Sequence, residues 1–217
     1  MKIIVLGAYG KSGRAIVTEA EKRGHNVLAV ARRKHDDISY EQELIKSTVE
    51  LTEEDITDYD VIIDGISAWT TDTFHIHKDT IFHIANLISG TNKRYIKIGG
   101  TSTTYINKEH TKQFKDWDGF PKESLPRGEA LAESLRYLRT FSNMAWTYAT
   151  PAYNFDANGK PTGKYTVKYE ELDLEDIPSS YISYADFATA LIDSVENKTY
   201  IRQRVIFVGN KEENKNI

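Results

Sequence analysis

The chain has 217 residues, of which 40% are hydrophobic and 28% charged, and its formal net charge is -4. This length suits one α/β domain whose core needs no disulfide or metal to hold it together. The mild acidity argues against a general nucleic-acid-binding protein, and the absence of cysteine excludes disulfides, thiolate metal sites and cysteine nucleophiles. The apolar run after Met1 ends within six residues, which is too short for a signal peptide or a membrane span. We therefore expect a cytoplasmic protein, monomeric or homodimeric, with neither membrane nor nucleic acid as a partner.

The first half of the chain alternates short apolar runs with stretches of helical periodicity. Residues 2–6 form an apolar run typical of a buried parallel strand. Residues 13–23 carry apolar side chains on one helical face and end before Gly24, a residue type that favours helix termination. Further along, the pattern predicts strands at residues 26–31, 47–51, 60–64 and 94–98 and a long helix at 72–88.

The second half contains the longest stretch without periodicity, residues 108–124, which we expect to form a lid or loop over the carboxyl edge of the sheet. Pro126 stands in the first turn of the next expected helix, where proline is favoured, and Ser183 begins a capping box with Asp186. The regular elements expected here are a helix at 125–141, a strand at 147–150, a helix from 183 to 195 and a final strand at 205–208. An alternating segment at 164–174 is expected to pair as a strand outside the parallel core. The polar tail at 211–217 is expected to fray.

Repeated strand-helix-strand units predict a parallel sheet that is covered by helices on both faces. We therefore expect an α/β protein with a Rossmann-type, doubly wound parallel sheet. The sequence shows no repeat, low-complexity linker or domain boundary, so we predict one domain over residues 1–217. Its last part, about residues 151–217, is expected to form a small extension on the substrate side.

A glycine-rich segment joins the first strand to the first helix, and Gly7, Gly10 and Gly13 recur in it every three residues. The first glycine allows a tight turn, the second lets the backbone approach a pyrophosphate, and the third allows the helix to pack against the strand. Unpaired N–H groups at the start of the helix then favour phosphate. The segment therefore predicts a dinucleotide site, against the alternative of a tight turn without a ligand. It is not a Walker A loop, because no Gly-Lys-Ser/Thr follows a glycine at the spacing that this motif requires.

The end of the second strand indicates which dinucleotide is bound. Enzymes that use NAD place an acidic residue about 20 positions after the glycines, where it binds the ribose 2′-hydroxyl. This chain has Arg32, Arg33 and Lys34 at that point. Arginine can bind a 2′-phosphate through two parallel hydrogen bonds, and Lys11 and Arg14 could add to such a pocket. The sequence thus predicts that the site binds NADPH, with NAD as the weaker alternative. If no ligand binds there, the basic residues would form a solvated surface loop.

Four later motifs accompany the glycine spacing: Ile98-Gly-Gly-Thr-Ser102, Trp146-Thr-Tyr-Ala-Thr-Pro151-Ala, Gly163-Lys-Tyr165 and Ile182-Ser-Tyr-Ala-Asp186-Phe-Ala. Together they resemble the atypical short-chain dehydrogenase/reductases, and among these the NmrA-like NAD(P)-binding and NADH-flavin reductase group, which also includes proteins similar to biliverdin reductase B. The resemblance covers nearly the whole chain. It implies a single-domain Rossmann protein that binds NAD(P), and it does not specify a substrate.

The resemblance also implies which residues contact the cofactor. The pyrophosphate would be held by Gly7, Tyr9, Gly10, Lys11, Ser12 and Gly13. The adenosine phosphate would lie on Arg32 and Arg33, and the adenine would lie beside Ser47 and Thr48. The ribose would pass Gly65, Ile66 and Ser67. The nicotinamide would be flanked by Gly99, Gly100, Thr101, Pro151 and Ala152.

The Tyr-x-x-x-Lys pair of standard short-chain dehydrogenases is missing, because no tyrosine has a lysine four residues later. That tyrosine protonates a carbonyl oxygen, so its loss argues against interconversion of alcohols and ketones. Ser102, which matches the serine of those enzymes, and Tyr153 remain as candidate catalytic residues. One reading is a reductase that moves hydride from NADPH to a flavin or quinone, which collects protons from solvent. The other is a non-catalytic NADP(H) sensor or regulator of the NmrA-like type.

Several aromatic side chains near the strand ends could stack on a planar acceptor, or could serve only in packing: Trp69, Trp117, Tyr153 and Phe155. We predict no metal site among His75, His77 and His83, because the first two face different sides of a helix and no acidic pattern completes a zinc site. His77 could instead face the acceptor pocket. Asp64 ends a strand near the expected cofactor, although a carboxylate is electrostatically unfavourable beside phosphates.

Overall fold

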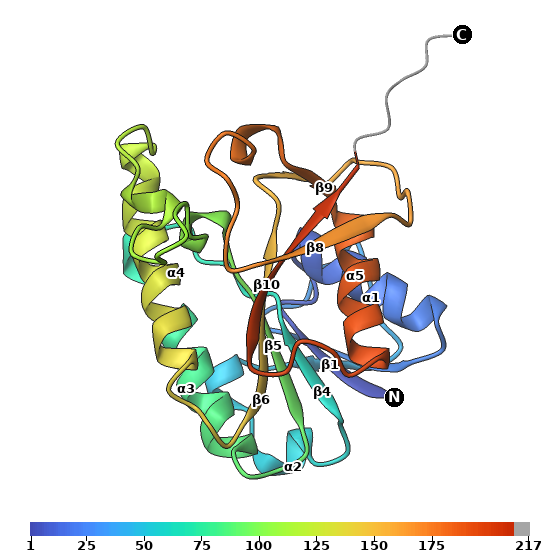
Figure 1. Cartoon of the computed structure of the whole chain (residues 1–217). Coiled ribbons are helices and arrows are strands. Elements are labelled where there is room, and N and C mark those ends of the chain that lie inside the picture. The colour runs from blue at the N-terminus through green and yellow to red at the C-terminus, as the bar shows by residue number, and fades with distance from the viewer. Residues whose placement is uncertain (211–217) are drawn as a thin grey trace, which may run out of the picture.

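The computed structural model describes residues 1–210, and its centre is a ten-stranded sheet (Figure 1). Seven strands run parallel: β1 (Lys2–Leu6), β2 (Asn26–Ala31), β3 (Glu43–Ile45), β4 (Val61–Asp64), β5 (Arg94–Ile98), β6 (Ala145–Pro151) and β10 (Gln203–Gly209). Three further strands complete it: β7 (Asn154–Asp156), β8 (Tyr165–Tyr169) and β9 (Tyr181–Ser183). The order is β3-β2-β1-β4-β5-β6-β10-β9-β7, with β8 also paired to β10. This order confirms the predicted Rossmann-type fold.

Helices cover both faces of the sheet. One face carries α1 (Lys11–Lys22) and α5 (Tyr184–Glu196), and the other carries α3 (Ile76–Ile88) and α4 (Leu125–Leu138), while α2 (Glu53–Ile56) is a single turn (Figure 1). Alternate residues of β1 enter the two layers: Ile3 and Val5 pack with α1 and α5, and Ile4 and Leu6 pack with α3. The central strand β1 is therefore apolar on both faces after Lys2, as expected for a parallel sheet buried on both sides.

The observed boundaries correct three expectations. The third strand is Glu43–Ile45 and not residues 47–51, because Ser47 and Glu50 form a capping box that opens a 3-10 turn at Thr48–Glu50. The long third helix begins at Ile76, and residues 71–73 form a separate 3-10 turn that is capped at Thr70. The fourth helix ends at Leu138 rather than at 141.

Other local signals are confirmed. Gly24 follows α1 with φ +79°, a conformation that suits glycine. Ser183 caps α5 by accepting a hydrogen bond from the backbone N–H of Asp186. The alternating segment forms β8, which pairs antiparallel with β10. The predicted tail at 211–217 lies outside the described residues.

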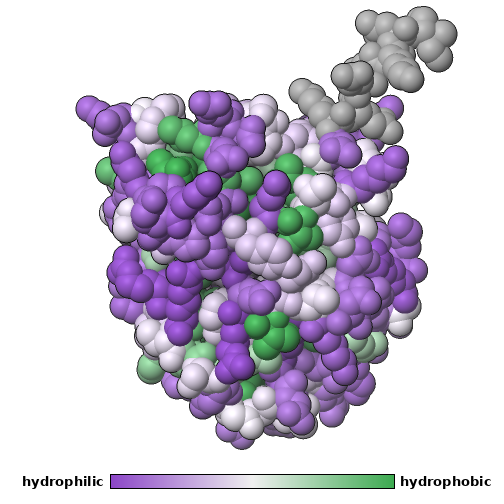
Figure 2. Space-filling model, in the orientation of Figure 1, coloured by the Kyte–Doolittle hydropathy of each residue, from purple (hydrophilic) through white to green (hydrophobic). Residues whose placement is uncertain are grey.

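The segment at residues 108–124 contains two 3-10 turns, Phe114–Asp116 and Lys122–Ser124. Phe114 is buried against Ile177 and Ile206, which fixes the middle of this segment to the C-terminal part of the sheet. The face of the molecule seen in Figure 1 is largely hydrophilic, with small separate hydrophobic patches (Figure 2). Within residues 1–210, no helix is both long and apolar enough to cross a membrane.

Candidate functional site

A cavity of about 1060 Å³ lies at the carboxyl edge of the parallel strands. Its wall includes the residues that directly follow three strands, namely Gly7 after β1, Gly65 after β4 and Gly99 after β5. The strand order reverses between β1 and β4, which is where ligands bind in open α/β sheets. The volume lies at the top of the range of about 300–1,000 Å³ for single small-molecule sites, so the cavity has room for more than one ligand.

All but one of the residues that the sequence assigned to the site line this cavity. The predicted lining residues found there are Gly7, Tyr9, Gly10, Lys11, Ser12, Arg32, Arg33, Ser47, Thr48, Gly65, Ile66, Ser67, Gly99, Gly100, Thr101, Ser102, Pro151, Ala152 and Tyr153. The exception is Gly13, which lies beneath the loop. A Cβ atom at Gly13 would stand 2.3 Å from the carbonyl oxygen of Gly7. Gly13 therefore allows α1 to pack against the loop and does not itself reach the cavity.

The glycine loop leaves the N-terminus of α1 open toward the cavity. Gly7 turns the chain with φ +72°, and the N–H of Gly10 donates to the carbonyl of Gly7 at 2.9 Å. Gly10 is the N-cap, no side chain caps the helix, and no acidic residue stands in its first turn. The N–H groups of Lys11, Ser12 and Gly13 have no acceptor within the helix. This cradle has the shape and the partial positive charge that a pyrophosphate requires.

Tyr9 lines the cavity, and its side chain is held by contacts within the protein. The phenol donates a hydrogen bond to the carboxylate of Glu43, and the ring stacks on His35 with centroids 5.0 Å apart. Burial and the neighbouring Glu43 raise the pKa of Tyr9 to about 12, so the phenol keeps its proton. The same carboxylate accepts a hydrogen bond from the ammonium of Lys34.

These contacts divide the basic residues near the end of β2 into two kinds. Lys34 is engaged by Glu43, and Arg14 pairs with Asp37 at 2.8 Å, outside the cavity wall. Arg32 and Arg33 line the cavity, are exposed, and form no ion pair within residues 1–210. Two guanidinium groups are therefore available to an anion at this end of the cavity.

A buried ion pair fixes the loop that follows β4. The Asp64 carboxylate accepts hydrogen bonds from the Tyr95 hydroxyl at 2.5 Å and from the backbone N–H of Ile66 at 2.9 Å. The Lys97 ammonium lies 3.0 Å from the same carboxylate and donates to the carbonyl of Ile66. Asp64 thus faces the protein interior rather than the cavity, and with Lys97 it holds Ile66 on the cavity wall.

Two glycines shape the wall where the sequence places the nicotinamide. A Cβ at Gly99 would lie 2.0 Å from the Tyr148 ring, and one at Gly100 would lie 2.8 Å from the Leu131 side chain. The Thr101 hydroxyl donates to the carbonyl of Pro151 at 3.1 Å. A larger residue at 99 or 100 would overlap with these side chains and displace the backbone that forms the cavity wall, so both positions require glycine for close packing.

The candidate catalytic residues stand apart from any acid–base partner. Ser102 and Tyr153 both line the cavity, and neither hydroxyl forms a side-chain hydrogen bond within the described part of the chain. Trp69 and Phe155 also line it, whereas Trp117 does not and instead stacks on Phe114 with centroids 5.9 Å apart. Trp117 is therefore a packing residue and not part of the cavity wall.

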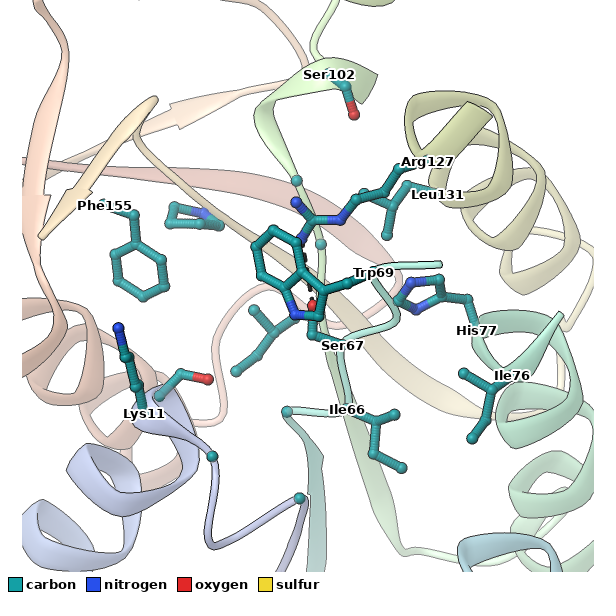
Figure 3. Close-up of a pocket in the computed structure, with 18 of the residues that line it drawn as sticks. Lys11, Ile66, Ser67, Trp69, Ile76, His77, Ser102, Arg127, Leu131 and Phe155 are labelled. Carbon is teal, nitrogen blue, oxygen red and sulfur yellow. Dashed lines mark hydrogen bonds between the residues drawn. The ribbon is translucent and has the colours of Figure 1, made fainter. Parts of the chain in front are cut away.

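Side chains from α3, α4 and the loop before α3 complete the cavity, and two of them, Arg127 and Leu131, were not predicted from the sequence. We call Trp69, His77, Arg127 and Leu131 the α3–α4 wall (Figure 3). The Arg127 guanidinium carbon lies 3.9 Å from the centre of the Trp69 ring. His77 was considered for this pocket and does line it. The only sequence signal for Arg127 is its place in the first turn of the helix expected at 125–141, and its contact with Trp69 appears only in the structure.

The histidine side chains do not meet at a common point. His75 bonds to Asp79, and His83 bonds to the backbone carbonyl of Leu51. His77 is only 2% exposed, and neither of its ring nitrogens has a hydrogen-bond partner among the described residues. Burial, together with the positive charges of Lys97 and Arg127, lowers the pKa of His77 to about 3. The ring is therefore neutral at physiological pH.

Comparison with known proteins adds to this geometry. The family model described as NAD(P)H-binding matches residues 7–198. The uncharacterized protein YwnB of Bacillus subtilis is 32% identical over 98% of this chain and 100% of its own length. A crystal structure named as a putative NADH-flavin reductase from Streptococcus pneumoniae is 36% identical in sequence, with a TM-score of 0.91. The match covers 97% of this chain and 100% of the other chain. A putative epimerase from Bacteroides thetaiotaomicron is 25% identical, with a TM-score of 0.79 and 98% coverage of both chains.

Proposed function

This chain belongs to the NAD(P)H-binding family, and we propose that it is an NADPH-dependent reductase that passes hydride to a planar acceptor such as a flavin or a quinone. One observation carries the proposal. A single cavity extends from an open helix N-terminus and two arginines that form no ion pair within residues 1–210 to a wall that carries Trp69 and Arg127. A cavity of this kind suits a dinucleotide at one end and a flat, conjugated molecule at the other.

The choice of NADPH rests on Arg32 and Arg33. Both line the cavity at the end of β2, where the ribose 2′-position of a bound dinucleotide lies in Rossmann folds. Neither has a carboxylate partner within residues 1–210. A 2′-phosphate would supply the missing negative charge, whereas a 2′-hydroxyl would leave both guanidinium groups unsatisfied.

The choice of acceptor rests on the groups available for proton transfer. Bound NADPH supplies a hydride, which is two electrons and one proton, and a flavin or quinone takes its remaining proton from solvent. Within residues 1–210, neither the Ser102 nor the Tyr153 hydroxyl bonds to a basic or acidic side chain, so neither is set up as a strong proton donor. The chain would therefore contribute by holding the two rings in contact and by excluding competing orientations.

The test measures NADPH oxidation with FMN, riboflavin or menadione as the acceptor, together with the dissociation constants of NADPH and NADH. Acceptor-dependent oxidation above the protein-free rate is the expected result. Tight NADPH binding without turnover of any acceptor would contradict the reductase and favour the non-catalytic NADP(H) sensor.

Arg32→Ala tests the cofactor preference. It should weaken NADPH binding by about 10- to 100-fold, because hydrogen bonds to charged groups are worth about 1.5–3 kcal/mol, and should leave NADH binding nearly unchanged. Lys34→Ala is the matched control, since Lys34 is engaged by Glu43 and does not line the cavity. Equal binding of the two cofactors by the unmodified protein would show that the preference is absent.

A further inference from the structure

Arg127 is a cation of the cavity wall that the cofactor interpretation does not use. It stands on α4, and its Nη2 donates to the Ser67 hydroxyl at 3.3 Å. Its Nε is buried without a partner, and no carboxylate lies within ion-pair distance of it among residues 1–210. Burial lowers the pKa of Arg127. A guanidinium that is partly desolvated and lacks a counter-charge is costly, and an anion bound in the cavity would offset that cost.

Trp69 fixes the direction in which Arg127 can bind. The guanidinium lies 3.9 Å from the centre of the indole ring, and Trp69 is 73% exposed (Figure 3). Stacking on an aromatic face holds the guanidinium plane while leaving its edge N–H groups for hydrogen bonds. Such an edge matches two oxygens of a phosphate or a carboxylate.

His77 provides a second, independent indication of a ligand on the same wall. Figure 3 shows its ring projecting from α3 into the part of the cavity that holds Trp69 and Arg127. Neither ring nitrogen has a partner among the described residues, although the side chain is almost completely buried. Buried polar groups are nearly always hydrogen-bonded. A neutral imidazole keeps one N–H donor, which could serve a ligand held by Arg127.

The position of Arg127 separates it from the residues that would hold the cofactor phosphates. It lies one helical turn before Leu131, whose side chain packs on Gly100 beside the expected nicotinamide. Arg32 and Arg33 instead follow β2, on the opposite side of the glycine loop from β4. A charge at Arg127 therefore stands where the acceptor, rather than the adenosine end of the cofactor, would lie.

We infer that the acceptor is an anion whose phosphate or carboxylate group binds Arg127 while its planar ring lies against the nicotinamide position. This inference rests on the proposed reductase function and narrows its substrate class. An uncharged flavin or quinone would leave Arg127 without a counter-charge and would be the poorer substrate.

Pairs of acceptors that share one ring system test the inference. FMN and riboflavin differ by a phosphate, and menadione and a naphthoquinone with a propionate side chain differ by a carboxylate. For each acceptor, kcat/KM is measured from NADPH oxidation. Its dissociation constant for the protein saturated with NADP⁺ is measured from the change in flavin or tryptophan fluorescence. We expect at least one anionic member to be favoured by about 10- to 100-fold in both measurements, as for a charge-assisted hydrogen bond.

The variant R127Q should remove this preference, because it should lower kcat/KM and affinity for the anionic member by about 10- to 100-fold more than for the neutral member. R136Q is the matched control, because Arg136 is an exposed arginine of the same helix that does not line this cavity. An anion preference that survives R127Q, an equal loss for both members of each pair, or the absence of any preference would overturn the inference. A tenfold weaker binding of NADPH by R127Q would also overturn it, because Arg127 would then serve the cofactor. Preferential binding of the anion through Arg127 without turnover would support the inference and contradict the reductase.

Discussion

Replacing Lys97 with methionine should strongly destabilise the protein, because it leaves the Asp64 carboxylate buried without its cation. Both side chains are 0% exposed, and the ammonium lies 3.0 Å from the carboxylate. Removing one partner of a buried pair costs about 3–5 kcal/mol, against a total stability of about 5–15 kcal/mol for a typical domain. For a protein of this size, each kcal/mol lowers Tm by about 2–4 °C, so a loss of roughly 6–20 °C is expected.

The assay is urea and thermal unfolding of three variants at pH 7: Lys97→Met, Asp64→Asn and the double variant. Asparagine keeps the shape of Asp64 and an oxygen that can accept from the Ile66 N–H. The double variant should be at least as stable as either single one, since no uncompensated charge remains. Lys97→Met should also weaken NADPH binding, because the Ile66 carbonyl on the cavity wall loses its donor. A loss below about 1 kcal/mol for Lys97→Met, or additive losses in the double variant, would refute this reasoning.

Two further predictions concern the glycine loop and the α3–α4 wall. Gly13→Ala should abolish cofactor binding or folding, because the new Cβ would stand 2.3 Å from the Gly7 oxygen. Gly24→Ala meets no atom of the described chain within 4 Å, so it should cost only about 1–2 kcal/mol of stability for its φ of +79° and leave NADPH affinity unchanged. Calorimetric titration of NADPH and the Tm of each variant compare the two, and equal effects would contradict the packing argument. In the folded protein the pKa of His77 is lowered from 6.5 to about 3. Between these two pH values the unfolded chain binds one more proton than the folded protein. The free energy of unfolding should therefore be highest above pH 6.5 and fall toward pH 3, by up to about 1.4 kcal/mol per pH unit. His77→Leu should flatten that part of the stability profile, and an unchanged slope in urea unfolding would show that His77 is not buried as a neutral ring.

Much of the fold could be predicted because its signals are local. The apolar runs of β1 and β4 identify strands buried on both faces, and glycine and capping residues mark the ends of the helices. The third strand was misplaced for a physical reason. At the edge of the sheet β3 pairs only with β2 and has three residues, so Leu44 and Ile45 are too short an apolar run to indicate a strand.

The sequence by itself was enough to predict which residues line the proposed cofactor end of the cavity, because these residues follow directly on parallel strands whose carboxyl ends meet at one edge. Glycine spacing and the arginines after β2 are short-range features and need no knowledge of packing. The rest was decided by tertiary structure. The pairing of Asp64 with Lys97, the engagement of Lys34 by Glu43 and the stacking of Arg127 on Trp69 each join segments that no local pattern connects. Only packing reveals which charges are neutralised and which, like Arg127, still face the cavity without a partner in the described chain, because charge compensation depends on distance in space and not on position in the sequence.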